Sequence, residues 1–146
     1  MDSKTILNKV KAILVADTTL SGYVQKFLIG PRPIVYDTIY PCIVLDVPSD
    51  RLAASARNNL QENNLVINIT PAISVSDREK AIIGDATHKG ILDMIADIKA
   101  ALKAKYPSLD KTCLYFTLSA ETIEDFSDMQ GKLADIAMTV IYRESV

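Results

Sequence analysis

Apolar side chains near the N-terminus recur every three or four residues, which is the spacing of one face of an α-helix. Lysines separate the members of this series, which is Ile6, Leu7, Val10, Ile13 and Leu14. Asp2 or Ser3 can cap the start of the helix. A short second helix or a turn follows over residues 20–28, and Gly30-Pro31 ends it.

Four other segments show the alternation or the short apolar runs of β-strands. The first covers residues 42–47, with Pro41 before it and Pro48 after it. The second covers residues 65–70 and is ended or bent by Pro71, and the last two cover residues 114–118 and 134–143. Proline is tolerated at the start of a strand but not in its middle. We therefore expect the first strand to lie between Pro41 and Pro48.

A longer helix is predicted between the two strand pairs, over residues 76–106. Ser76 and Glu79 have the spacing of a capping box, and Pro107 stops the helix. An apolar stripe that should cover a sheet consists of Ile83, Thr87, Ile91, Met94, Ile95, Ile98, Ala101 and Leu102. Ile82 and Leu92 fall outside the stripe, and they suggest more apolar surface than a monomer needs.

The order of elements is helix, two strands, helix, two strands, which is typical of an α+β protein. We predict a four-stranded, mainly antiparallel sheet that is covered on one face by the N-terminal helix and the long helix. A chain of 146 residues fits one domain, here residues 1–146. Residues 49–64 are rich in Ala, Asn and Ser, and we expect them to form a long hairpin loop.

Composition and charge narrow the classes of partner. The net charge of −2 gives no basic footprint for nucleic acid, so we expect no specific nucleic-acid binding. No stretch approaches the ~20 apolar residues of a membrane span, and the N-terminus lacks the apolar core of a signal peptide. The sequence thus predicts a soluble, intracellular protein without a membrane partner. In that compartment Cys42 and Cys113 are expected to be buried thiols rather than a disulfide.

No catalytic set can be assembled from the sequence. His88 is the single histidine and lies at the border of the helical stripe, where a structural role is the simpler interpretation. Together with Cys42 and Cys113 it lacks the ligand spacing of a zinc site, and the nucleotide-binding glycine motifs are absent. We therefore expect no catalytic, cofactor-binding or metal-binding residues, no cofactor and no enzymatic activity.

Three segments are better candidates for contacts with other proteins. The connection between the last two strands is acidic and forms either a solvated hairpin tip or a docking surface; its acids are Glu121, Glu124, Asp125 and Asp128. The hairpin loop offers two arginines and two apolar anchors, namely Arg51, Arg57, Leu52 and Leu60. Pro31, Pro33 and Pro41 restrict a segment that contains Ile34 and Tyr36. Such a pre-ordered segment loses little entropy when it lies against a neighbour.

The whole chain resembles the tail terminator, or tail completion, proteins of long-tailed bacteriophages. The resemblance lies in the N-terminal helix, the proline before a short strand (residues 40–45), the long hairpin and helix, and the connection Asp128-Met129-Gln130-Gly131. The loop after Asn58 departs from many members of that family because it carries less charge.

The resemblance implies a structural virion protein at the head-proximal end of the tail, assembled in the host cytoplasm. Such a protein forms a ring, usually a hexamer, on the last ring of the tail tube, stops tube polymerisation and provides the joint to the head. The implied partners are further copies of the chain, the tail tube protein, a head-completion or neck protein and, in a contractile tail, the sheath terminator region.

Two other classes stay open on the sequence alone. One is a small α+β adaptor or regulatory domain that binds a peptide or protein partner, and the other is an enzyme whose catalytic set the sequence does not reveal. The size of the protein in solution distinguishes a ring-forming tail protein from an adaptor domain. A ring former runs far above 16.0 kDa, whereas an adaptor stays monomeric or dimeric.

Overall fold

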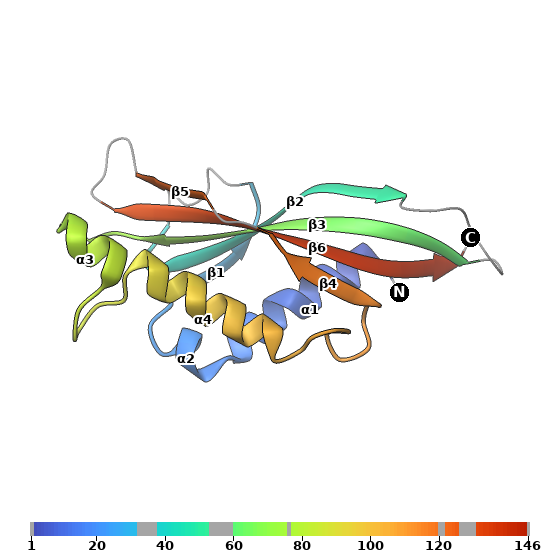
Figure 1. Cartoon of the computed structure of the whole chain (residues 1–146), viewed down its shortest axis with the longest axis horizontal. Coiled ribbons are helices and arrows are strands. Elements are labelled where there is room, and N and C mark those ends of the chain that lie inside the picture. Colours follow the sequence, from blue (N-terminus) through green and yellow to red (C-terminus); the bar gives the residue numbers. More distant parts are fainter. Residues whose placement is uncertain are drawn as a thin grey trace.

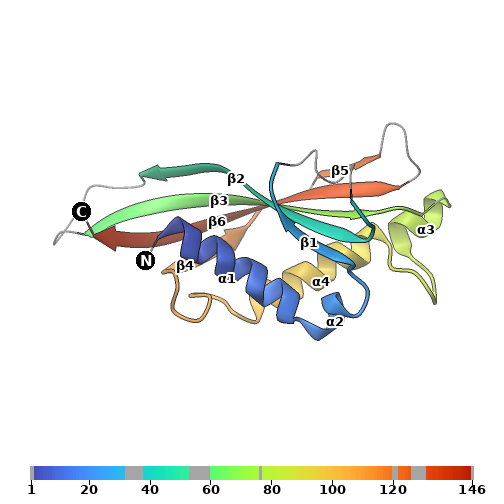
Figure 2. The same ribbon diagram turned by 180° about the vertical axis from the view of Figure 1, so that it is seen from behind.

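The computed structural model describes residues 2–31, 38–52, 60–75, 77–119, 122–125 and 131–145. It is an elongated α+β structure in which a long twisted sheet carries helices along one face (Figures 1 and 2). The helices are α1 (Ser3–Ala16), α2 (Thr18–Ser21), α3 (Arg78–Ile83) and α4 (Ile91–Lys103). The strands are β1 (Lys26–Ile29), β2 (Cys42–Leu52), β3 (Leu60–Ile73), β4 (Tyr115–Leu118), β5 (Thr122–Asp125) and β6 (Lys132–Ser145). The α+β class is therefore confirmed.

The sheet has six strands and is mixed, which corrects the predicted four-stranded layout. Its order is β1-β2-β3-β6-β4, and β5 also pairs with β6. β1 runs parallel to β2, with Lys26 opposite Cys42, whereas the other pairs are antiparallel. The helix or turn predicted for the segment of β1 is therefore wrong. This segment lacks a clear alternation because Phe27 packs on the main core while Leu28 packs on a second cluster on the other side of the sheet.

The predicted hairpin loop at residues 49–64 is mostly strand. β2 continues through Pro48 to Leu52, and β3 begins at Leu60; within this segment, residues 53–59 lie outside the described residues. The pairing register shifts between Asp46 and Ser49, which places Pro48 in an irregularity of the ladder. A proline at a bulge interrupts pairing locally without ending the strand. Pro71 likewise lies within β3 and does not end it.

The predicted long helix is two helices. α3 ends before Gly84, whose φ of 75° lies in the left-handed region that terminates helices. α4 begins after Gly90 and ends at Lys103, short of the predicted end at residue 106. Thr87 lies in the connection and is exposed, as is Ile83, so neither belongs to the core stripe. Asp77 caps α3, since its side chain accepts a hydrogen bond from the Lys80 amide, and the predicted cap Ser76 lies outside the described residues.

One large core lies between the helices and the sheet. Asp2 caps α1, since its side chain accepts a hydrogen bond from the Thr5 amide. α1 buries the predicted residues Ile6, Val10, Ile13 and Leu14. α4 contributes the remaining members of the predicted stripe, which are Ile91, Met94, Ile95, Ile98, Ala101 and Leu102. Alternate residues of β3 and β6 complete this core, including Leu65, Ile67, Met138 and Val140.

Candidate subunit-interaction site

The described strands that contain predicted interface residues lie at the two ends of the long molecule. Arg51, Leu52 and Leu60 belong to the β2–β3 hairpin at one end, near the C-terminus (Figure 1). The acidic strand β5, which carries Glu124 and Asp125, lies with α3 at the opposite end in both ribbon views. The side chains of Arg51, Leu52 and Leu60 lie outside the described set, as do Ile34, Tyr36, Arg57, Glu121 and Asp128. The structure therefore separates the two charged segments within one chain.

The acidic connection contains a short strand that sequence reasoning missed. β5 pairs with the start of β6, so that Glu124 lies opposite Leu133 and Asp125 lies opposite Lys132. All four residues of β5 are exposed, and Asp125 forms an ion pair with Lys132. The antiparallel pairing with β6 fixes the position and register of β5. The acidic residues of β5 are thus held on a strand rather than on a free loop.

The hairpin end carries a polar cluster within the sheet. The hydroxyl of buried Tyr142 donates to the carboxylate of Asp50, at 2.8 Å and 3.0 Å from its two oxygens. The amide of Asn63 donates to the same hydroxyl at 3.2 Å. These bonds join β2, β3 and β6 side by side, since Asn63 pairs with Tyr142 in the ladder. The cluster therefore ties the three long strands together where they extend toward the hairpin tip.

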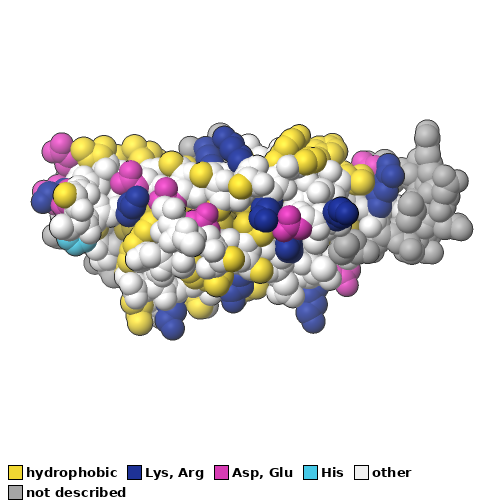
Figure 3. All heavy atoms as spheres, turned by 90° about the horizontal axis from the view of Figure 1, so that it is seen from below, with side chains coloured by type: hydrophobic (Ala, Val, Ile, Leu, Met, Phe, Trp, Pro, Cys, Tyr) yellow, Lys and Arg dark blue, Asp and Glu magenta, His cyan; other side chains and the backbone are white. Residues whose placement is uncertain are grey.

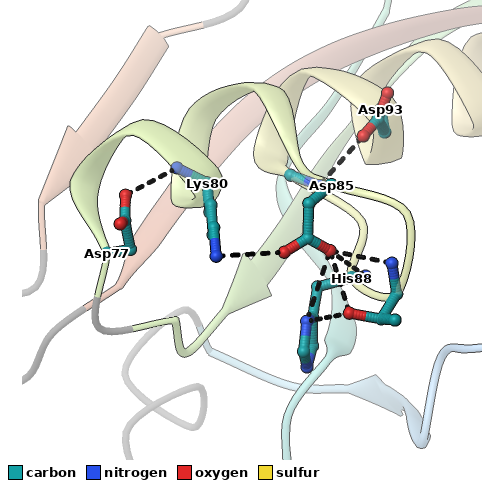
Figure 4. Close-up of polar contacts among 7 residues, drawn as sticks. Asp77, Lys80, Asp85, His88 and Asp93 are labelled. Atoms are coloured by element: carbon teal, nitrogen blue, oxygen red, sulfur yellow. Dashed lines mark hydrogen bonds and ion pairs between the residues drawn. The ribbon is translucent and has the colours of Figure 1, made fainter.

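The turn between α3 and α4 is fixed by two glycines and by Asp85. A Cβ atom at Gly90 would lie 2.5 Å from the Gly84 amide and still closer to the Ile82 carbonyl oxygen, so only glycine fits there. One Asp85 oxygen accepts bonds from the amides of Thr87 and His88, and the other lies 3.5 Å from the Lys80 ammonium (Figure 4). Backbone contacts and side-chain hydrogen bonds thus give this turn a defined conformation.

Hydrogen bonds within this turn hold Asp85 in its charged form. The Thr87 amide contributes most, followed by the His88 amide, and together they keep the pKa of the Asp85 carboxyl well below its usual range. His88 itself lies in the exposed turn, with Nδ1 at 2.9 Å from the Thr87 hydroxyl. The helical position predicted for His88 is therefore wrong, because the helix has already ended at Gly84.

A second structured turn follows α4 at the other end of the helix layer. Leu109, Asp110 and Lys111 all have positive φ, a conformation that costs a non-glycine residue about 1–2 kcal/mol. Burial of Leu109 in the core and hydrogen bonds to Ser108 hold the turn in place. Asp110 accepts ion pairs from Lys9 of α1 at 3.0 Å and from Lys105 at 3.3 Å. The ion pair between Asp110 and Lys9 therefore joins this turn to α1.

Charged side chains of both signs lie along the helix side of the molecule (Figure 3). Lys and Arg side chains are interspersed with Asp and Glu side chains from the α3 end to the middle of this face.

Within the described residues, the cysteines and the histidine do not come together in one site. Burial raises the pKa of Cys42 to about 12 and that of Cys113 to about 11, so both thiols stay protonated at neutral pH. Both cysteines are free; Cys42 is buried and Cys113 is half-buried. Among the described residues, no three His, Cys, Asp or Glu side chains are grouped as metal ligands. No helix in the described ranges is both long and apolar enough to cross a membrane.

Comparison with known proteins gives a structural match and no sequence match. No family model matches the chain, and no curated protein matches its sequence. A chain in the solved "Virion of native gene transfer agent (GTA) particle" shares the fold, with a TM-score of 0.53 at 9% sequence identity. The match covers 99% of this chain and 100% of that chain. The virion chain and this chain therefore have the same overall fold.

Two structures of PilO, a type 4 fimbrial biogenesis protein of Pseudomonas aeruginosa, overlap less well. Their TM-scores are 0.29 and 0.26 at 10% identity, over 70% of this chain and 58% and 79% of theirs. TM-scores this low do not indicate that PilO and this chain share a fold.

Proposed function

We propose that this chain is a structural subunit of a virion, and that it acts as a tail terminator. In this role it forms a closed ring, with six subunits expected, at the head-proximal end of the tail tube. The ring stops tube polymerisation and provides the joint to the head or neck. The observation that carries the proposal is the fold shared with a virion chain over the full length of both chains.

The elongated shape supports assembly into a ring. A closed ring of identical subunits is built from a contact between two different patches, because each subunit binds the next in the same orientation. The hairpin and the β5–α3 region lie at opposite ends of this chain, and they differ in sequence and charge. Two unlike ends on one subunit are what such a contact needs.

The proposed ring contact joins the hairpin of one copy to the acidic end of the next. Arg51, Arg57, Leu52 and Leu60 would supply the hairpin side, with Glu124, Asp125 and Asp128 on the other side. Ile34 and Tyr36 of the proline-rich segment would lie against the same neighbour. Charge complementarity of this kind sets register and partner choice more than affinity.

Native mass spectrometry and electron microscopy of the purified chain test the proposal. We expect a single closed ring and, after addition to growing tubes of tail tube protein, tubes that stop at the ring. A chain that stays monomeric or dimeric at all concentrations and leaves tube length unchanged would contradict the proposal. That second outcome would instead favour an adaptor domain.

A further inference from the structure

The outer half of β2 lies beyond a break in its pairing with β3. The two strands pair in one register from Cys42 to Asp46 and in a shifted register from Ser49 to Leu52. β1 pairs with β2 at residues 42–45, so within the described residues the outer half of β2 is paired with β3 alone. We name residues 49–52 and 60–64 the arm, which lies at the hairpin end of the molecule (Figures 1 and 2).

The register of the arm is not determined by the inner half of the sheet. A register shift separates the two halves, and a slip of one residue turns every side chain of a strand to the opposite face. Burial on one face normally prevents such a slip. In the outer half of β2, however, Ser49 is only half-buried and Asp50 is exposed. Another contact that depends on register is therefore needed to hold the arm.

Tyr142 of β6 supplies a contact of this kind. Its side chain is only 1% exposed, and its hydroxyl donates to the Asp50 carboxylate of β2, at 2.8 Å and 3.0 Å from the two oxygens. β3 lies between β2 and β6 in the sheet, so the bond reaches across a whole strand. If β2 slipped by one residue, Asp50 would point to the other face and the bond would be lost. The bond therefore reports the register of the arm.

Asn63 adds a polar group at a position where the neighbouring pattern is apolar. The next core-facing residues of β3 are Leu65, Ile67 and Ile69, which are fully buried. Asn63 is 6% exposed; its Nδ2 donates to the Tyr142 hydroxyl at 3.2 Å, and its buried Oδ1 has no partner among the described residues. A buried acceptor without a partner costs stability, whereas a polar network requires one arrangement of its members. The cluster is thus better suited to specify the position of the arm than to raise stability.

We propose that Tyr142 and Asp50 hold the arm in register and that ring formation depends on this bond. The inference rests on the proposed function, in which the β2–β3 hairpin contacts the next subunit. It assigns Tyr142 and Asp50 as positioning residues, which act on that contact through the arm. An arm without the bond would have to be ordered when two subunits meet, and the entropy lost in ordering it would lower their affinity.

Hydrogen exchange of the arm amides tests the bond below the concentration of ring formation. Tyr142→Phe removes the hydroxyl and keeps the buried ring, and Asp50→Ala changes an exposed residue, so both variants should fold. In both, the arm amides should exchange about tenfold faster, as expected for the loss of one hydrogen bond to a charged group, while the α4 amides keep their protection. Asp50→Asn retains an oxygen that accepts from Tyr142 and should behave like the wild type.

Thr70→Val is the matched control for ring formation. Thr70 of β3 is 1% exposed, and its hydroxyl donates to Asp135 of β6 at 2.8 Å, so this variant also removes a buried bond between strands, but outside the arm. Sedimentation velocity measures the concentration at which rings form. That concentration should rise at least about tenfold for Tyr142→Phe and Asp50→Ala, because each contact must then order an arm. It should stay near the wild-type value for Thr70→Val and Asp50→Asn.

The outcomes separate the role of this bond from the ring itself. Unchanged exchange of the arm in Tyr142→Phe and Asp50→Ala, or faster exchange with rings at the wild-type concentration, would overturn the inference and leave the ring standing. Equal weakening by Thr70→Val would also overturn it, because a general loss of sheet stability would then explain the effect. A wild-type chain that never forms rings would contradict the proposed function and the role in assembly, whereas the exchange data would still show whether the bond holds the arm.

Discussion

Ile95 of α4 lies in the core, only 4% exposed, three residues after Leu92, which faces solvent. Ile95→Ala is expected to lower the free energy of unfolding by about 2–5 kcal/mol, because it leaves a cavity among close-packed side chains. Leu92→Ala is the matched control on the same helix and should cost well under ~1 kcal/mol. Denaturant titration of both variants measures the difference. Equal losses would mean that α4 does not pack on the sheet as described.

The contribution of the Asp85 carboxylate to stability can be tested by its dependence on pH. Its folded pKa is lowered, so the charged carboxylate stabilises the turn above the unfolded pKa of about 3.9. This stabilisation is lost as the pH falls from there through the lower folded pKa. Asp85→Asn keeps the shape but cannot ionise. The difference in stability between wild type and variant should therefore be full near neutral pH and should shrink in acid. A difference that stays constant down to a pH of about 2 would contradict this role.

The turn between α3 and α4 shows how an element depends on the absence of a side chain. Gly90→Ala would push a Cβ atom against the backbone of Ile82 and Gly84, where no flexible side chain can move away. We expect a loss of about 1–3 kcal/mol, as in overpacked cores, and weaker protection of the α3 amides from hydrogen exchange.

Gly22→Ala is the control for Gly90→Ala. A Cβ atom at Gly22 would lie 3.3 Å from the carbonyl oxygens of Thr18 and Thr19, which is tight but not overlapping. Gly22→Ala should therefore lower the free energy of unfolding clearly less than Gly90→Ala does. Equal effects would show that the close approach at Gly90 does not determine the turn.

At the scale of the whole molecule, the hairpin provides a test of assembly. Arg51→Glu with Arg57→Glu should leave the chain folded, because surface charges change stability by no more than about 0.5 kcal/mol. The double variant should nevertheless weaken ring formation or tube capping, since it reverses the charge of the proposed hairpin contact. In a phage, the expected result is tails of uncontrolled length, or tails that do not join heads.

Light scattering and electron microscopy measure this effect, with Lys26→Glu on the exposed part of β1 as a charge-reversal control outside the hairpin. Normal rings of the double variant on normal tails would show that the hairpin makes no essential contact.

The spacing of apolar residues along the chain was enough to predict the elements that bury a single face. The spacing of Ile6, Val10, Ile13 and Leu14 predicted the buried face of α1, and the stripe from Ile91 to Leu102 predicted that of α4. The alternation in residues 134–143 likewise predicted the buried face of β6. These elements follow from the sequence because a helix or strand with one apolar face has one favourable way to bury it.

Features that depend on contacts between separate chain segments were decided only by the tertiary structure. β1 is a strand because β2 offers it an open edge, and β2 passes Pro48 because β3 continues beside it through a register shift. The break between α3 and α4 depends on the contact of Gly90 with residues 82–84. A sequence pattern reports periodicity along the chain, whereas strand pairing and close approach are properties of chain segments brought together by folding.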